Sequence, residues 1–266
     1  MSVTLRDALF ELIRTHPCIR LDDVYFVRDP ELYRGERHEA CCCAQCKKKN
    51  SHESAIRREL LKLEHARAIH SDYVRISIPT SRYPHHNKVM WVGYPGRSRN
   101  TLSHDSDVTS FHVRLRRACA EYGLDDPEWK YGTQQNAVTK DVNPDGVFVI
   151  SRPRSDYLSP FFYEEERKRG HYAYGNPQII AKVKQYAAYR RTGRMRPDFG
   201  FDDARLAIRC TTQTTMTNLL RDLERTAPWR WIWVTAIPLC TPDIAAPIWH
   251  TPADSEHRAY SLTETA

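Results

Sequence analysis

The N-terminal part of the chain shows apolar residues at helical spacing, broken by short polar segments. Residues 4–16 carry such a stripe, with Thr4 placed to cap the helix and Asp7 three positions further on. A second short helix is predicted over 19–28 and a third over 52–69. The third helix has its apolar stripe at Ile56, Leu60 and Leu63. The pattern therefore predicts three helices before any strand.

Alternating apolar residues then replace the helical pattern. The segment DYVRISIP (72–79) alternates, and NKVMWVGYPG (87–96) predicts a second strand. The loop between these strands is basic and aromatic. Three helices followed by a hairpin is the order of a winged helix-turn-helix. We therefore predict such a DNA-binding domain over residues 1–96, with a cysteine-rich insertion before its third helix.

Residues 104–252 mix both patterns and predict an α/β domain. A segment rich in Gly, Ser and Arg around 95–104 is predicted to be the linker. The order that follows is helix, two strands, helix, strand, helix, strand. We expect helices at 108–124, 176–193 and 214–225 and strands at 146–151, within 156–166, at 204–210 and at 229–236. Residues 253–266 are predicted to form a polar, loosely ordered tail.

Composition is that of a globular protein, and the charge adds an argument about partners. The chain has 266 residues, 41% of them hydrophobic and 27% charged, with a net charge of +7. A basic excess favours a polyanionic partner, nucleic acid first, although it also serves solubility. No apolar run approaches the roughly 18 residues that span a bilayer, and the amphipathic N-terminus does not read as a signal peptide. We therefore predict a cytoplasmic protein without a membrane partner.

Cations on the third helix and in the hairpin are the candidate DNA contacts. On the helix, Arg57, Arg58 and Lys62 lie off the apolar stripe, where they would face phosphates or guanine edges. In the hairpin loop, cations and rings suit contact with the DNA backbone. The candidates there are Arg82, Tyr83, His85 and His86. The alternative is that the helix cations form only a solvated face, paired with Glu59 and its neighbours.

Four of the eight cysteines crowd into the segment CCCAQC. Cys43 and Cys46 have the C-x-x-C spacing with which two thiolates bind one Zn2+. The second pair of ligands is either His38 with Cys41 or Cys41 with His52. A structural zinc would staple the insertion, whereas the alternative is an exposed, thiol-rich loop. The isolated cysteines are predicted to lie in the core: Cys18, Cys119, Cys210 and Cys240.

Acidic residues at the ends of two predicted strands are the candidate catalytic site. Asp145 precedes the strand GVFVIS, and Glu164 and Glu166 end the strand that contains FFYEEE. If the two strands form a hairpin, Asp145 and Glu164 lie close enough to bind Mg2+ or Mn2+, which would polarise a scissile phosphate. The alternative is that PDG and EEERKR are only turns.

This pattern is similar to the P-D then [D/E]-x-K arrangement of restriction nucleases. Here Glu166 occupies the position of the lysine, where positive charge is wanted. Glu166 could instead bind the metal ion, with Lys182 on the following helix supplying the cation that stabilises charge in the transition state. The candidate catalytic residues are therefore Asp145, Glu164, Glu166 and Lys182.

The order of these segments resembles the replication-relaxation family, which is associated with plasmids and other mobile elements. The resemblance covers roughly residues 4–250 and implies a winged helix joined to a divergent, restriction-endonuclease-like α/β domain. It rests on SAIRRELLKLEHARAI, KVMWVGYPG, SHDSDVTSFHVRLRRA, NPDGVFVI, FFYEEER, KVKQY and APIW. The positions that it carries over are His104, Asp145, Glu164, Glu166, Arg167, Lys182 and Tyr186. The chain departs from the family at Glu166, where aspartate is usual, in lacking the Gly-Thr that usually follows the arginine, and in the segment CCCAQC.

The resemblance implies a DNA-binding protein of a plasmid or mobile element that acts in replication, relaxation or mobilisation. Its expected partners are double-stranded DNA and a relaxase or replication protein, and a homodimer is one expected assembly. Three alternatives stay open. They are an active Mg2+-dependent DNA endonuclease, a non-catalytic winged-helix transcriptional regulator, and a zinc-stapled protein-interaction module.

Overall fold

The computed structural model of the chain describes residues 3–28, 44–76, 85–92, 96–132, 139, 141–156, 158–167, 177–240, 243–254 and 258–262. The chain divides into two compact units, Met1–Val113 and Arg114–Ala266. The division falls within a helix, α4 (Arg99–Glu121), and each unit is described by itself. The domain limits predicted from the sequence, 1–96 and 104–252, stay predictions.

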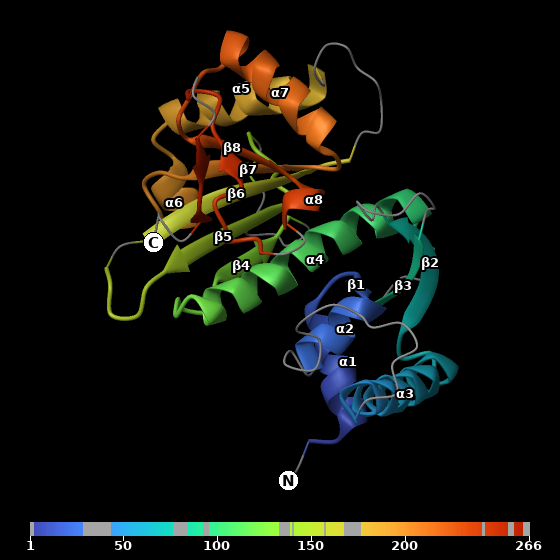
Figure 1. The fold of residues 1–266 in the computed structure, drawn as a ribbon. Coiled ribbons are helices and arrows are strands. Elements are labelled where there is room, and N and C mark those ends of the chain that lie inside the picture. The colour runs from blue at the N-terminus through green and yellow to red at the C-terminus, as the bar shows by residue number, and fades with distance from the viewer. Residues whose placement is uncertain are drawn as a thin grey trace. The chain divides into compact units, whose positions relative to one another are not determined.

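The first unit contains helices and a small antiparallel sheet (Figure 1). Its elements before α4 are α1 (Leu5–Thr15), β1 (Ile19–Arg20), α2 (Leu21–Arg28), α3 (Ala44–His65), β2 (His70–Ile76) and β3 (His85–Trp91). The strand order is β1-β3-β2. Three helices followed by a hairpin are present in the described residues, as predicted. The prediction that no strand precedes the hairpin is wrong, because Ile19 and Arg20, which were expected to begin the second helix, form β1 and pair with β3. The assignment of this unit as a winged helix-turn-helix stays a prediction.

Local signals in the sequence account for the helices of this unit. Thr4 caps α1, because its hydroxyl accepts the Asp7 backbone N–H at 3.2 Å, as predicted. The predicted stripe of the third helix is confirmed, since it is buried against α1. The core residues of the two helices are Leu9, Ile13, Ile56, Leu60 and Leu63. The third helix begins earlier than predicted, at Ala44, because Ala, Gln and Lys are good helix formers.

The start of α4 differs from the sequence prediction. The helix begins at Arg99, within the segment that was predicted to be a linker, whereas the pattern placed its start at Val108. The Ser98 hydroxyl accepts the Thr101 N–H at 3.2 Å in the manner of a helix cap. Ser106 is fully buried and donates to the Ser103 carbonyl oxygen at 2.9 Å. This stretch has the polar composition of a linker, but its polar residues form hydrogen bonds within the protein. Composition alone therefore predicted a linker where the helix begins.

The second unit is an α/β domain, as predicted. Its described residues form a seven-stranded sheet, whereas the sequence pattern predicted only four of these strands. Its elements after α4 are β4 (Glu128–Tyr131), β5 (Gly146–Ser151), β6 (Leu158–Glu166), α5 (Pro177–Arg191), α6 (Met195–Phe199), β7 (Arg205–Cys210), α7 (Gln213–Thr226), β8 (Ile232–Ala236), α8 (Ile237–Cys240), β9 (Trp249–His250) and β10 (Ala259–Tyr260). The strand order is β10-β9-β8-β7-β6-β5-β4. The central pairs β6–β7 and β7–β8 are parallel, and the outer pairs are antiparallel.

The helices α5 and α7 cover one face of this sheet (Figure 1). The core on that face combines residues of both helices with residues of β6, β7 and β8. Among its members are Phe162, Val183, Tyr186, Leu206, Ile208, Leu219 and Val234. Because side chains alternate along a strand, the neighbours of Phe162 in β6 project to the other face. This alternation decides which acidic residues of β6 face α5.

Part of the predicted polar tail joins the sheet. Ala259 and Tyr260 form β10, which pairs antiparallel with β9 through Tyr260 and Trp249. Leu262 is fully buried, and the Ser261 hydroxyl donates to the Ala245 carbonyl oxygen. An edge strand satisfies its backbone groups by pairing and needs few apolar side chains. Polar composition alone therefore did not reveal this strand.

Candidate active site

The antiparallel pairing of β5 with β6 brings two acidic residues together at one end of the sheet. Gly146 is opposite Tyr163, so Asp145, just before β5, lies beside Glu164. The Asp145 N–H donates to the Tyr163 carbonyl oxygen at 2.9 Å. The Glu165 N–H donates to Asp145 Oδ2 at 2.8 Å. The hairpin predicted from the sequence is therefore present, and the Asp145 carboxylate is held against the backbone of β6.

The glycine of the Pro-Asp-Gly segment has a packing reason. A Cβ atom added to Gly146 would lie 2.5 Å from Cζ2 of Trp129, which is closer than two carbon atoms approach. The Trp129 ring occupies this space and stacks on Phe148, with 5.6 Å between ring centroids and 6° between the planes. The segment is therefore the packed start of β5, next to Asp145.

Glu164 is the most enclosed acidic group on this face, with 2% of its surface exposed. Lys182 Nζ donates to Glu164 Oε2 at 2.5 Å, and the Tyr186 hydroxyl donates to Oε1 at 2.7 Å. Burial, followed by repulsion from the Asp145 carboxylate, raises the pKa of Glu164 to about 8. The hydrogen bonds from Lys182 and Tyr186 oppose this rise. The surroundings of Glu164 therefore favour its protonated form more than water does.

Lys182 and Tyr186 reach Glu164 because they lie four residues apart on α5, on one face of the helix. Burial lowers the pKa of Lys182, but attraction to Glu164, Asp145 and Glu166 outweighs it and raises the pKa above its ordinary value. Its side chain keeps 41% of its surface exposed. Lys182 therefore stays cationic at the position predicted from the sequence. Tyr186 was carried over only through the Lys-x3-Tyr resemblance, and its hydrogen bond makes it part of the site.

Glu166 lies on the same face of β6 as Glu164, because the two are separated by one residue. It is 8% exposed. Its backbone carbonyl accepts the Thr211 N–H at 3.1 Å and the Thr211 hydroxyl at 3.0 Å. The end of β6 is thereby joined to the end of β7. Lys182 is the cation that contacts Glu164, and the roles of Glu166 and Lys182 in catalysis stay predictions.

The cations predicted to read DNA lie on the exposed side of α3. Arg57 donates to the Tyr25 hydroxyl at 2.5 Å and lies 3.6 Å from Glu53. Lys62 pairs with Glu59 at 2.7 Å, as the alternative interpretation expected. Arg58 is exposed. The role of these residues in DNA binding stays a prediction.

Other predicted ligands lie partly or wholly outside the described residues. These are Arg82 and Tyr83 in the hairpin loop and His38, Cys41 and Cys43 in the cysteine-rich segment. The backbone is described, but not the side chain, for Cys46 on α3 and for His85 and His86 on β3, whereas His52 on α3 is described and partly exposed. Within the described part of the chain, no group of three or more His, Cys, Asp or Glu residues is placed to hold a metal ion. The zinc site stays a prediction.

The isolated cysteines are confirmed as core residues. Burial raises the pKa of Cys18 and of Cys119 to about 12 in each case. In the first unit, Arg97 donates to the Cys18 sulfur at 3.2 Å and pairs with Asp105 at 3.0 Å. The buried cysteines in the described part of the chain are Cys18, Cys119, Cys210 and Cys240. Buried thiols with raised pKa values are poor nucleophiles, so these residues are structural.

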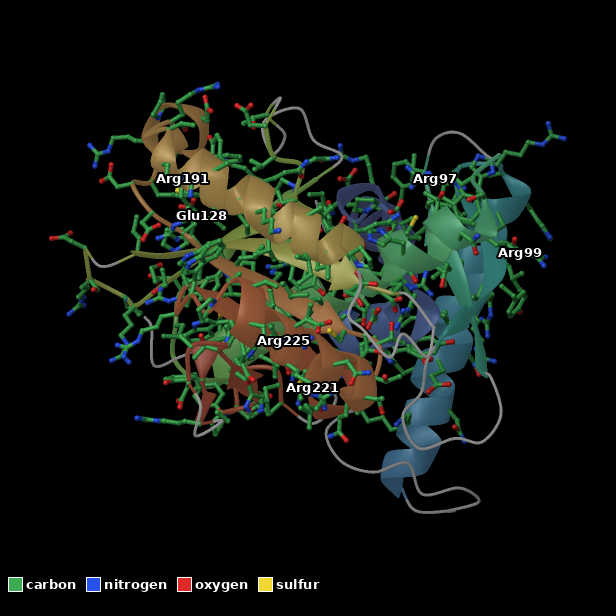
Figure 2. All side chains as sticks on the ribbon, turned by 90° about the horizontal axis from the view of Figure 1, so that it is seen from above. Arg97, Arg99, Glu128, Arg191, Arg221 and Arg225 are labelled. Carbon is green, nitrogen blue, oxygen red and sulfur yellow. The ribbon has the colours of Figure 1, made fainter. Side chains whose placement is uncertain are left out.

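Arginines line the outer side of the helices that cover the site's face of the sheet. Figure 2 shows Arg191 on α5 and Arg221 and Arg225 on α7, all of them exposed. Arg221 donates to the Asn218 side chain at 3.3 Å, and Arg225 pairs with Asp222. In the first unit, Arg97 and Arg99 lie beside the start of α4 (Figure 2).

Comparisons with known proteins do not identify a family for this chain. No protein-family model matches the chain, and no curated protein matches its sequence. Among solved structures, restriction endonuclease FokI is similar at a TM-score of 0.30 and 10% identity, over 87% of this chain and 41% of that chain. This chain thus spans less than half the length of that protein. The likeness is coarse, and the α/β class rests on the element order and sheet described above. The resemblance to the replication-relaxation family stays a prediction.

Proposed function

We propose that this protein binds duplex DNA and that its second unit carries a divalent-metal-dependent site for DNA cleavage. One observation carries the proposal. Asp145 and Glu164 meet at the same end of two paired strands, and Lys182 contacts Glu164 there. Two carboxylates and a lysine are the groups that metal-assisted phosphodiester hydrolysis requires of a protein.

The donor set fits a hard cation. Mg2+ and Mn2+ prefer oxygen ligands, and Asp145 and Glu164 supply carboxylate oxygens. The Asp145 charge contributes to the raised pKa of Glu164, which means that the two groups repel each other when both are ionised. A bound divalent cation supplies neutralisation of that charge and Lewis-acid polarisation of a phosphate oxygen. Lys182, whose side chain is 41% exposed, would be placed to stabilise negative charge on a phosphate beside Glu164.

The first unit is proposed to dock the protein on DNA. The whole chain has a net charge of +7, which attracts the phosphate backbone, and Arg58 lies exposed on α3 in the first unit. If Arg58 contacts one phosphate, Arg58→Ala lowers the slope of log affinity against log salt by about 0.9. Arg6→Ala, an equal loss of charge on α1, serves as the matched control and leaves a larger slope. Equal slopes for both variants would place the contact elsewhere.

The biological setting is proposed from the family resemblance alone. Replication, relaxation or mobilisation of a plasmid or mobile element, with a relaxase or replication protein as partner, is the setting that the resemblance implies. Among the described residues, no helix has both the length and the apolar character needed to cross a membrane. The cytoplasmic location and the homodimer stay predictions.

The test of cleavage is a nicking assay on supercoiled plasmid with Mg2+ or Mn2+. Wild-type protein is expected to nick, and Asp145→Asn and Glu164→Gln are expected to lose nicking while they still shift the plasmid in a gel. Asp126→Asn is the matched control, because Asp126 is exposed and pairs with Arg116, away from the acidic pair. Nicking that persists in both active-site variants would assign it to a contaminant or to another site.

A second candidate is a DNA-binding protein that does not cut. Glu166 stands where a nuclease motif has lysine, and both Glu164 oxygens already accept hydrogen bonds. Such a protein would serve as an accessory factor or transcriptional regulator. Plasmid that is shifted but never nicked, with either metal ion, favours this candidate.

A further inference from the structure

Behind the acidic site, on the opposite face of β6, lies a buried ion pair that sequence reasoning missed. Glu165 projects away from Glu164 and meets Arg209, its register partner on β7. Arg209 Nε lies 2.8 Å and its terminal nitrogen 2.7 Å from Glu165 Oε2. The Tyr163 hydroxyl donates to the same oxygen. The Glu165 and Arg209 side chains are 0% and 4% exposed. We call Tyr163, Glu165 and Arg209 the clamp.

The backbone of the clamp residues holds Asp145. The Asp145 N–H donates to the carbonyl oxygen of Tyr163 at 2.9 Å. The Glu165 N–H donates to Asp145 Oδ2 at 2.8 Å. Both bonds therefore involve clamp residues, since Glu165 pairs with Arg209 on the other side of the sheet and the Tyr163 hydroxyl donates to Glu165. A shift of β6 that loosened the clamp would move both partners of Asp145 together.

Stability is a weak reason for placing this ion pair here. A buried salt bridge is often no better for stability than apolar residues of the same volume. In addition, Glu165 Oε1 is buried without a hydrogen-bond partner among the described residues, which is unfavourable. The ion pair joins the side chains of β6 and β7 at Glu165, the residue whose N–H donates to Asp145. Loss of a group that orients a metal ligand typically lowers metal affinity by about 10–100-fold.

We propose that the clamp positions the Asp145 carboxylate for metal binding, so that Tyr163, Glu165 and Arg209 are positioning residues rather than ligands. The metal-binding role of Asp145 rests on the proposed function. The positioning itself concerns only the bond between the Glu165 N–H and Asp145 Oδ2. The two parts can therefore be tested with separate readouts.

The experiment compares wild-type protein with the double variant Glu165→Leu plus Arg209→Met and with Glu165→Gln. The double variant replaces the pair with apolar residues of similar volume, and Glu165→Gln keeps the shape but removes the charge. The matched control is Arg20→Met plus Asp107→Leu, which removes a mostly buried ion pair from the first unit. The readouts are Mn2+ affinity by calorimetry, hydrogen exchange of individual backbone amides by NMR, and thermal unfolding.

The expected result is a drop in Mn2+ affinity of about 10–100-fold in the double variant, as for other groups that orient a metal ligand. The Glu165 amide is expected to exchange faster in both clamp variants, relative to the other amides of β6. The ion-pair control keeps wild-type affinity and wild-type exchange at Glu165. A merely structural pair would change the unfolding temperature without a selective change at this amide.

Two outcomes overturn the inference. Wild-type Mn2+ affinity in a folded double variant refutes positioning for metal binding. Unchanged exchange of the Glu165 amide in Glu165→Gln and in the double variant refutes the mechanical link itself. If wild-type protein binds no Mn2+, the proposed function fails, and the amide exchange still decides whether the clamp holds Asp145.

Discussion

Two adjacent glutamates of β6 have opposite surroundings. Glu164 faces α5, where a partly exposed lysine and a tyrosine hydrogen-bond to it, and its pKa is raised to about 8. Glu165 faces the other side of the sheet, where Arg209 and Tyr163 donate to one of its oxygens in a fully buried pair. Strand alternation places the two side chains on different faces.

The difference in surroundings suits Glu164 to proton or metal binding and suits Glu165 to holding β6 in place. Glu164 can lose its ion pair and take up a proton, because burial and Asp145 already favour its neutral form. A carboxyl group of this kind can exchange a proton for a metal ion. Glu165 is held by a guanidinium that remains charged at any working pH. Its side chain is therefore suited to holding the strand, and the following predictions test this difference.

The largest expected effect is on the free energy of unfolding when the cation beside each glutamate, Arg209 or Lys182, is replaced. Arg209→Met leaves Glu165 as an uncompensated buried charge and is expected to lower the free energy of unfolding by about 3–5 kcal/mol. Lys182→Met leaves Glu164 able to bind a proton, so we expect a loss of only about 1 kcal/mol. Urea unfolding at pH 7 measures both. Equal losses would contradict the assignment of different roles to the two faces.

The next effect concerns metal binding. Mn2+ at one hundred times its dissociation constant is expected to raise the free energy of unfolding of wild-type protein by about 2.7 kcal/mol. Asp145→Asn and Glu164→Gln are expected to abolish this rise, because each removes a charged oxygen ligand. Glu128→Gln, at an exposed carboxylate on β4 (Figure 2), is the control and keeps it. A rise that survives in both site variants would place the metal ion elsewhere.

The pH dependence of stability follows from Glu164. Its pKa is raised from 4.5 to about 8 on folding, so the folded state binds more protons than the unfolded state between these values. Stability attributable to this group is therefore full below pH 4.5 and falls by about 1.4 kcal/mol per pH unit as the pH rises towards 8. Denaturant unfolding from pH 5 to 8 should show a flatter profile for Glu164→Gln than for Glu128→Gln. Parallel profiles would mean that Glu164 titrates normally.

The smallest effect concerns the tyrosine of the site. Tyr186→Phe removes one hydrogen bond to Glu164 and is expected to cost about 1 kcal/mol. Because that bond lowers the pKa of Glu164, its loss should move the pH-dependent step upwards. Tyr189→Phe is the matched control. Tyr189 lies on α5, like Tyr186, but its hydroxyl donates to Asp198 rather than to Glu164. If Tyr189→Phe shifted the pH-dependent step as much as Tyr186→Phe, the hydrogen bond from Tyr186 to Glu164 would have no specific effect on the pKa of Glu164.

Local patterns in the sequence were enough to predict several parts of this protein. The stripe of α3, the strands β5 and β6 and the helix α5 follow from apolar periodicity, which local burial imposes on the chain. The meeting of Asp145 and Glu164 was predicted as well, because a hairpin between neighbouring strands fixes which ends lie together. The position of Lys182 followed from the same order of elements.

Other features depended on tertiary structure. The pairing of Glu165 with Arg209 joins strands that are connected through α5, and the register of a parallel pair is not written in either strand's own pattern. The apolar pattern did not predict the early start of α4 or the strand β10, because both contain polar residues. In the folded protein these segments form hydrogen bonds within the protein instead of with water. By itself the sequence determined which residues could form the site, since periodicity is local. Only the tertiary structure decided which side chains support it, since that support comes from residues distant in the chain.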